Sequence, residues 1–250
     1  MTQHLTILTG ASRGMGLAMA EQLLGHGHDL LCISRKHNDA LGLKASGLQR
    51  RCEQWPMDLA RAEAAVRLEA WLASLDASAI DSVTLINNAA MVPAIAPLAA
   101  MPATAISDGL RVDLEAPMLL TSAFLRGTQA WQARRKVLNI SSGLGRHAMA
   151  SQALYCAAKA GMDHFTRCVA LEEAGRANGA KVCSLAPGVI DTDMQVQLRS
   201  ANASQFPDVA NFIGMKEKGM LTSPADAAAR VLAILARADF GDNPVADVRD

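Results

Sequence analysis

Residues Leu5 to Gly16 read LTILTGASRGMG, an apolar run that passes directly into a glycine-rich turn and then into a helix-like segment. A glycine-rich turn between a strand and a helix lets the backbone approach a pyrophosphate, which the helix N-terminus attracts through free N–H groups and its dipole. The spacing is G-x-x-x-G-x-G rather than the generic G-x-G-x-x-G, so an ordinary strand–helix turn remains the alternative. The residues predicted to bind a dinucleotide here are Gly10, Ser12, Arg13, Gly14, Met15 and Gly16.

Outward from this turn, short apolar runs alternate with longer helix-like segments. The apolar runs are residues 5–8, 30–33, 83–86, 137–140 and 182–185, and the helix-like segments are residues 16–24, 60–75, 107–126, 153–177 and 224–238. Strands that are apolar on both faces and alternate with helices are typical of a parallel sheet that is covered on both sides. The pattern predicts a single doubly wound α/β domain over residues 1–250. Residues 191–221 fit it poorly and are predicted to form a helical insertion over the substrate.

The composition excludes several classes of protein. Half of the residues are hydrophobic and 19% are charged, which argues against intrinsic disorder. The 24 basic and 24 acidic residues balance, so neither a nucleic-acid surface nor a polybasic membrane patch is expected. The longest stretch without a charge, residues 82–107, contains three prolines and two asparagines, which disfavours a membrane-spanning helix. Five cysteines without metal-ligand spacing argue against a disulfide framework and a metal site, and no signal peptide is visible, so a cytoplasmic location is expected.

The residues after the second apolar run indicate which dinucleotide binds. NAD-binding units usually place an acid there for the ribose 2′-hydroxyl, whereas an arginine suits a 2′-phosphate. Here Ser34, Arg35 and Lys36 follow the run, and no acid appears before Asp39. With Arg13 they can pair with a phosphate, so the sequence favours NADP(H). The alternative is that these basic side chains are simply solvated.

A second constellation points to proton transfer. The one tyrosine of the chain, Tyr155, is followed four residues later by Lys159, which places both side chains on one face of a helix. An ammonium group near a phenol lowers the phenol pKa from its ordinary value near 10. Ser142 follows the apolar run 137–140 and offers a hydroxyl that can polarise a carbonyl.

With these residues, the chain resembles the short-chain dehydrogenase/reductase family along nearly its full length. The matching motifs are residues 9–16, Asp58 after the third strand, residues 87–90, Ser142, the Tyr155–Lys159 pair and residues 187–192. The resemblance implies a Rossmann-type fold and a small-molecule carbonyl substrate, with Ser142, Tyr155 and Lys159 as catalytic residues. It also implies that Lys159 binds the nicotinamide ribose. The further cofactor contacts that it implies are Asp58, Leu59, Asn88, Ala89, Ala90, Pro187, Gly188, Ile190, Thr192 and Met194.

The chain departs from the family pattern at Asp113. The family usually carries an asparagine on this helix, where it supports a water relay behind the lysine. An aspartate keeps the shape but adds an acceptor-only charge. We expect Asp113 to contribute to the relay, by pairing with Lys159 and weakening its effect on Tyr155. The alternative is a surface carboxylate beside Arg111.

Within the family, residues 116–122, 155–160, 186–195 and 216–221 resemble the sepiapterin reductase and benzil reductase branch. This branch reduces one ketone of a vicinal dicarbonyl, so the expected substrate contacts are Ser142, Tyr155, Met194 and Asp247. Asp247 matches an aspartate that anchors a pterin ring, although a solvated terminal carboxylate is an equal alternative. An aryl diketone is slightly favoured over a pterin.

Two other functions remain open at this stage. One is an alcohol dehydrogenase that works oxidatively with the same residues, and the other is a sensor or scaffold that binds NADP(H) without turnover. The family resemblance also implies a homodimer or homotetramer formed through the helices at residues 107–126 and 153–177.

Overall fold

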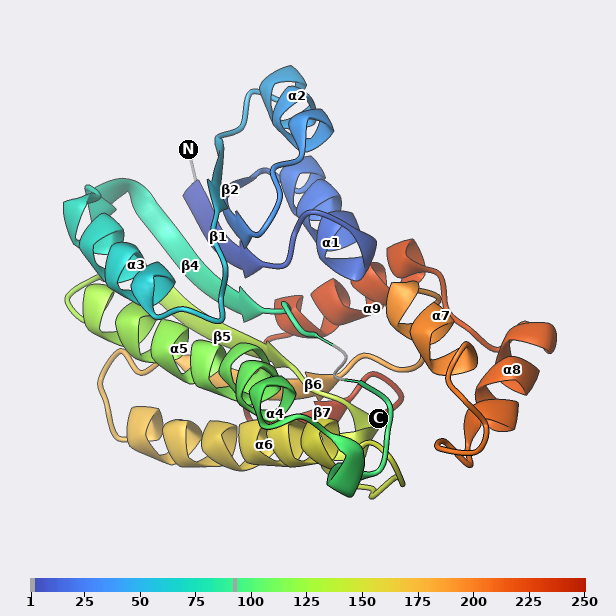
Figure 1. The fold of residues 1–250 in the computed structure, drawn as a ribbon. Coiled ribbons are helices and arrows are strands. Elements are labelled where there is room, and N and C mark those ends of the chain that lie inside the picture. Colours follow the sequence, from blue (N-terminus) through green and yellow to red (C-terminus); the bar gives the residue numbers. More distant parts are fainter. Residues whose placement is uncertain (1–2, 92–93) are drawn as a thin grey trace.

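The computed structural model describes residues 3–91 and 94–250. Its centre is a seven-stranded parallel sheet with the strand order β3-β2-β1-β4-β5-β6-β7 (Figure 1). The strands are β1 (Gln3–Thr9), β2 (His28–Ser34), β3 (Cys52–Pro56), β4 (Ile80–Asn87), β5 (Arg134–Ile140), β6 (Lys181–Ala186) and β7 (Val245–Asp247). Each of the five predicted apolar runs lies inside a strand, so the predicted doubly wound α/β fold is confirmed.

Helices connect the strands and cover both faces of the sheet. They are α1 (Gly14–Gly25), α2 (Asp39–Gly47), α3 (Glu63–Ser74), α4 (Ala103–Leu110), α5 (Ala116–Gly127), α6 (Ala153–Ala174), α7 (Asp193–Arg199), α8 (Val209–Glu217) and α9 (Pro224–Ala236). Short 3-10 turns are η1 (Ala77–Ala79), η2 (Leu98–Ala100) and η4 (Gly143–Gly145). The helix predicted over residues 107–126 is divided, because one π-helical turn, η3 (Arg111–Glu115), separates α4 from α5. Among the described residues, no helix is both long and apolar enough to cross a membrane.

The side chains of each central strand alternate between two cores. Leu31 and Ile33 of β2 pack in one core with apolar residues of α3 and α5. Leu30 and Cys32 point the other way, into a second core with residues of α1, α2 and α9. Strands that are buried on both faces explain why the sequence shows continuous apolar runs here rather than alternation.

Side-chain caps define the N-termini of α2 and α9. Asn38 accepts a hydrogen bond from the Leu41 N–H at 3.0 Å and so starts α2. Ser223 accepts one from the Asp226 N–H at 3.1 Å, and Pro224 occupies the first turn of α9. Both caps satisfy N–H groups that a helix N-terminus otherwise leaves unpaired.

The poorly patterned segment near residues 191–221 forms α7 and α8, which project away from the sheet (Figure 1). They share a small apolar cluster of their own, made of Leu198, Phe206, Val209 and Phe212. The helical character of the insertion agrees with the sequence, whereas its role over a substrate stays a prediction. β2 and β3 are added on one side of β1, whereas β4 and the later strands are added on the other side. The strand order therefore reverses between β1 and β4, although all strands stay parallel. Open α/β sheets bind ligands at such a point, beyond the carboxyl ends of the strands.

Candidate active site

A cleft of about 1480 Å³ opens at the carboxyl ends of the strands. It exceeds the roughly 300–1,000 Å³ of most small-molecule sites, so it has room for a dinucleotide together with a substrate. The cleft brings together the residues that the sequence assigned to cofactor and substrate, from Gly10 in the glycine loop to Asp247 in β7. Asp113 is the one predicted site residue that does not line it.

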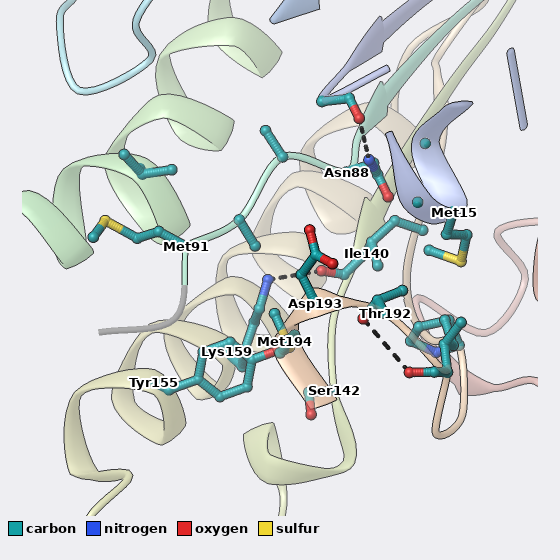
Figure 2. A pocket seen from close by; sticks show the side chains of 18 of the residues that line it. Met15, Asn88, Met91, Ile140, Ser142, Tyr155, Lys159, Thr192, Asp193 and Met194 are labelled. Atoms are coloured by element: carbon teal, nitrogen blue, oxygen red, sulfur yellow. Dashed lines mark hydrogen bonds between the residues drawn. The ribbon is translucent and has the colours of Figure 1, made fainter. Parts of the chain in front are cut away.

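The glycine loop lies directly on the end of β4. A Cβ atom on Gly10, whose φ is +72°, would lie 2.9 Å from Cα of Ala89, and one on Gly16 would lie 2.1 Å from the Gly10 carbonyl oxygen. Asn88 holds the loop from below, since its Nδ2 donates to the carbonyl oxygens of Thr9 at 3.0 Å and Gly10 at 3.3 Å (Figure 2). Only glycine permits this close approach.

The start of α1 is suited to a phosphate group. No side chain caps this helix, and its first turn contains no acid. Its N–H groups and positive dipole end therefore face the cleft without an internal anion, as dinucleotide binding requires. Together with the glycine cradle, this arrangement fits a pyrophosphate.

The end of β2 brings one buried hydroxyl and two exposed basic side chains to the cleft. The hydroxyl of Ser34 is buried and makes no hydrogen bond within the described structure. Arg35 and Lys36 follow it, exposed at the rim of the same cleft. Asp39, the nearest acid along the chain, is bound by the His37 ring at 2.8 Å. This end of the cleft therefore suits an anion, whereas Arg13, also predicted to bind it, forms an ion pair with Asp193 at the start of α7.

Tyr155 and Lys159 lie in the first turns of α6, beside the end of β5. The residues are 9% and 2% exposed, respectively. The Lys159 ammonium lies 5.6 Å from the centre of the Tyr155 ring and donates to the Ile140 carbonyl at 2.9 Å (Figure 2). Ser142 follows β5, and its Oγ accepts a hydrogen bond from the Leu144 N–H at 3.2 Å. The three predicted catalytic side chains therefore converge in one buried corner of the cleft.

The pKa of the Tyr155 phenol is raised, whereas the spacing of Tyr155 and Lys159 predicts that it is lowered. Burial raises the pKa of the Tyr155 phenol, the nearby Asp113 charge raises it further, and the Ser142 hydroxyl opposes them. Burial also lowers the pKa of Lys159, although Asp113 and Asp163 both oppose that shift. Loss of hydration is thus the largest cause of both shifts, and at Tyr155 it favours the neutral phenol.

Asp113 lies in the π-helical turn η3 and is 1% exposed. Its Oδ1 accepts a hydrogen bond from the Met91 N–H at 2.8 Å, and its buried Oδ2 has no hydrogen-bond partner within residues 3–91 and 94–250. Burial raises the pKa of this carboxyl to about 6, against the attraction of Lys159. The alternative of a surface carboxylate beside Arg111 is therefore wrong, and Arg111 instead lies 3.8 Å from Asp108. The expected pairing of Asp113 with Lys159 is not seen among the described residues, and the ammonium donates to the Ile140 carbonyl.

The substrate end of the cleft is mostly apolar. Met149, Met194 and Phe212 line it and belong to the apolar cluster of the insertion. Gln195 is 7% exposed, and its buried Oε1 has no hydrogen-bond partner among the described residues. This amide was missed from the sequence, because nothing in a local pattern distinguishes it from an exposed helical glutamine.

Asp247 lies in β7 and is 6% exposed, so it is not a solvated terminal carboxylate. Both of its oxygens accept from the Arg249 guanidinium, at 2.7 and 2.6 Å. This bond and the positive charge of Arg249 lower the pKa of Asp247. A pterin ring at Asp247 would have to displace Arg249, which also lines the cleft.

Comparison with known proteins agrees with this geometry. Residues 4–203 match the model of the short chain dehydrogenase family. The chain is 34% identical to a benzil reductase ((S)-benzoin forming) of Bacillus cereus, over 96% of both chains. It is 30% identical to the sepiapterin reductase of Xenopus tropicalis, over 92% of this chain and 90% of that protein.

Solved structures share the fold. A 3-oxoacyl-[acyl-carrier protein] reductase from Brucella melitensis, in complex with NAD, superposes with a TM-score of 0.81 over 99% of this chain and 96% of that one, at 23% identity. Another matched structure holds NADP. The comparisons therefore leave the choice between the two dinucleotides to the residues of this chain.

Proposed function

This chain belongs to the short-chain dehydrogenase family, and we propose that it is an NADPH-dependent carbonyl reductase acting on one ketone of a vicinal dicarbonyl. The observation that carries the proposal is the buried Tyr155 phenol, whose pKa is raised by burial, with Ser142 against it and the Lys159 ammonium 5.6 Å from the centre of its ring. A protonated phenol is the form that a ketone reduction consumes.

Three side chains at the end of β2 support NADPH over NADH, whereas the pyrophosphate site would serve either dinucleotide. The unpartnered Ser34 hydroxyl, Arg35 and Lys36 would hold a 2′-phosphate where NAD-binding chains carry an acid. Gly10, Gly16 and the open end of α1 would hold the pyrophosphate. The cofactor supplies the hydride when bound.

Ser142, Tyr155 and Lys159 then stabilise or neutralise the negative charge that develops on the ketone oxygen. Ser142 donates a hydrogen bond to the carbonyl oxygen and stabilises the negative charge that develops there. Tyr155 transfers its phenolic proton to that oxygen as the alkoxide forms. Lys159 lies close enough to stabilise the resulting phenolate, and its anchor on the Ile140 carbonyl keeps the ammonium in place.

Asp113 is the part of this proposal that departs from the family. A protonated carboxyl can both donate and accept a hydrogen bond, as the usual asparagine amide can, whereas an ionised one only accepts. The ionised form also opposes phenolate formation at Tyr155. We propose that Asp113 stands in the relay behind Lys159 and biases the enzyme toward reduction rather than alcohol oxidation. The titratable groups that its charge interacts with are Lys159 and Tyr155, both on α6.

The proposed substrate is an aryl diketone such as benzil, with a pterin such as sepiapterin as the second candidate. Similarity to the benzil reductase and the apolar wall around Met149, Met194 and Phe212 support the diketone. The Arg249 guanidinium on Asp247 disfavours a pterin, since the carboxylate that would anchor the ring is already bonded. The proposal also places the enzyme in the cytoplasm as a homodimer or homotetramer, in keeping with its five free cysteines.

The test is NADPH consumption by the purified protein with benzil and, in parallel, with sepiapterin. Tyr155→Phe keeps the ring and removes only the proton donor, so we expect turnover to fall by about 10²–10⁴-fold with NADPH binding retained. Equal turnover by the variant would exclude Tyr155 as the acid. A wild-type protein that binds NADPH tightly and reduces no carbonyl would favour the sensor function, and a faster alcohol oxidation would favour the dehydrogenase.

A further inference from the structure

A second buried acid lies behind the catalytic corner, and the mechanism above does not use it. Asp163 follows Lys159 by one turn of α6 and is 2% exposed. Its Oδ1 accepts from two hydroxyls, Ser141 Oγ and Ser184 Oγ, both at 2.6 Å. Ser141 adjoins Ser142 at the end of β5, and Ser184 lies in β6. One carboxylate oxygen thus joins α6 to two neighbouring strands.

The other oxygen of Asp163 faces the loop that carries Ser142. Its Oδ2 lies 3.3 Å from Arg146 Nε, an ion pair whose angles do not make it a hydrogen bond. The same guanidinium reaches β7, where its Nη2 donates to the Ala246 carbonyl at 3.1 Å. Arg146 therefore connects the buried acid to the strand that carries Asp247.

The loop also approaches α6 as closely as backbone atoms allow. A Cβ atom on Gly145 would lie 3.0 Å from the Lys159 carbonyl oxygen and 3.0 Å from Asp163 Oδ2. Any side chain at this position would push the loop away from the helix. The position of Ser142 relative to Tyr155 thus depends on how tightly residues 141–146 are held against α6.

An ion pair between a buried carboxylate and a guanidinium that is 31% exposed contributes little net stability, because the carboxylate loses its hydration while water weakens the attraction. Well-packed apolar residues would hold the same elements together at least as well. The Asp163 cluster is therefore better explained by what it positions than by what it stabilises. We propose that Asp163 is a positioning residue, which holds the Ser142 loop on α6 through Ser141 and Arg146 and keeps a negative charge beside the Lys159 ammonium.

This inference rests on the proposed reductase function for its kinetic readout. The first variant is Asp163→Asn, whose oxygen still accepts from Ser141 and Ser184 while the charge is gone. We expect kcat to fall about tenfold with KM little changed, and the high-pH limb of the rate profile to move down by about one unit, because Lys159 loses a neighbouring anion. The second variant is Arg146→Gln, which leaves the Asp163 charge without its counter-ion. We expect the same limb to move up.

The matched control is Glu173→Gln. Glu173 is likewise a buried acid on α6, 4% exposed and 3.1 Å from Arg135, but it follows Lys159 by fourteen residues of the helix instead of four. We expect it to lower the melting temperature and to leave the pH profile unchanged. Opposite shifts for the two Asp163-cluster variants and none for the control would support the proposal. A folded Asp163→Asn protein with wild-type kcat and pH profile would overturn it, as would an identical shift in Glu173→Gln.

A readout without turnover separates this inference from the proposed function. Tyr155 is the only tyrosine, so protein labelled with ¹³C at the tyrosine Cζ gives one carbon signal that reports the phenol directly. We expect this signal to move in Asp163→Asn and to stay in Glu173→Gln, with no cofactor or substrate present. If the wild type reduces no carbonyl, the function fails and this signal still decides the inference. If Asp163→Asn does not fold, Arg146→Gln and Ser184→Ala decide it, and wild-type signals in both would refute it.

Discussion

Replacing Asp113 by asparagine should make the protein more stable at neutral pH, although the residue lies beside the active site. The side chain is buried at 1% exposure, with one oxygen bonded to the Met91 N–H and the other without a partner in the part of the chain that the structure describes. An asparagine of the same shape keeps the acceptor and carries no charge. It therefore removes the cost of burying an ionised carboxylate.

The size of this effect follows from the pKa shift. The carboxyl pKa rises from 3.8 to about 6 on folding, and about 1.36 kcal/mol per unit gives roughly 3 kcal/mol. Below pH 3.8 both folded and unfolded chains hold the proton, so the carboxyl costs nothing. Between pH 3.8 and 6 the unfolded chain releases its proton first, and the folded state loses stability as the pH rises. Above pH 6 the full deficit remains.

Urea unfolding of both proteins at pH 8, 6 and 4 measures this difference. We expect Asp113→Asn to be more stable by up to about 3 kcal/mol at pH 8, which corresponds to a melting temperature about 6–12 °C higher. The gain should shrink to about 0.5 kcal/mol at pH 4, where the unfolded carboxyl is only partly ionised. The matched control is Asp108→Asn, one turn earlier on a half-exposed side chain, which should stay within about 0.5 kcal/mol at every pH. A difference that is independent of pH, or a variant that is less stable at pH 8, would refute the reasoning.

Three further predictions concern the cofactor and the far end of the sheet. Gly16→Ala should abolish NADPH binding, measured by cofactor fluorescence, because the added carbon would lie 2.1 Å from the Gly10 carbonyl oxygen; binding at wild-type strength would contradict this. Arg35→Asp should reverse the ratio of kcat/KM for NADPH over NADH, and an unchanged ratio would remove Arg35 from the 2′-phosphate site. His28→Asn should resist acid unfolding better than wild type. Burial and the neighbouring His4 lower the His28 pKa from 6.5 to about 4, so the wild type loses stability as the pH falls through this window. The loss is on the order of 2 kcal/mol after allowance for partial exposure, and identical acid midpoints would show it to be absent.

Much of the fold was predictable because its strands are buried on both faces. The five central strands produce apolar runs that need no tertiary information to recognise. The edge strands gave no such signal. In β3 only Trp55 is buried, and β7 has three residues, so neither contains a readable period. The short α2 was also missed, since it is held by the Asn38 cap rather than by a long amphipathic pattern.

The candidate site likewise contains features that the local sequence reveals and features that depend on the folded structure. Tyr155 and Lys159 were found because a spacing of four residues on a helix is local information. The same spacing extends to Asp163 and would have indicated it. The direction of the Tyr155 pKa shift could not be predicted, because it depends on how deeply the folded chain buries the phenol. The partnership of Asp247 with Arg249 likewise depends on where β7 joins the sheet.

The order of the strands along the chain also sets the order in which the two sides of the cleft are synthesised. The phosphate-binding loop and the Ser34 rim belong to the first strands to leave the ribosome, which form one side of the sheet. Tyr155 follows much later, and the wall around Asp247 is added only when β7 pairs with β6. A nascent chain that has reached α6 thus already carries the nucleotide loop while the substrate side of the cleft is still open. The chain therefore completes the loop that fits a dinucleotide before it completes the opposite side of the cleft.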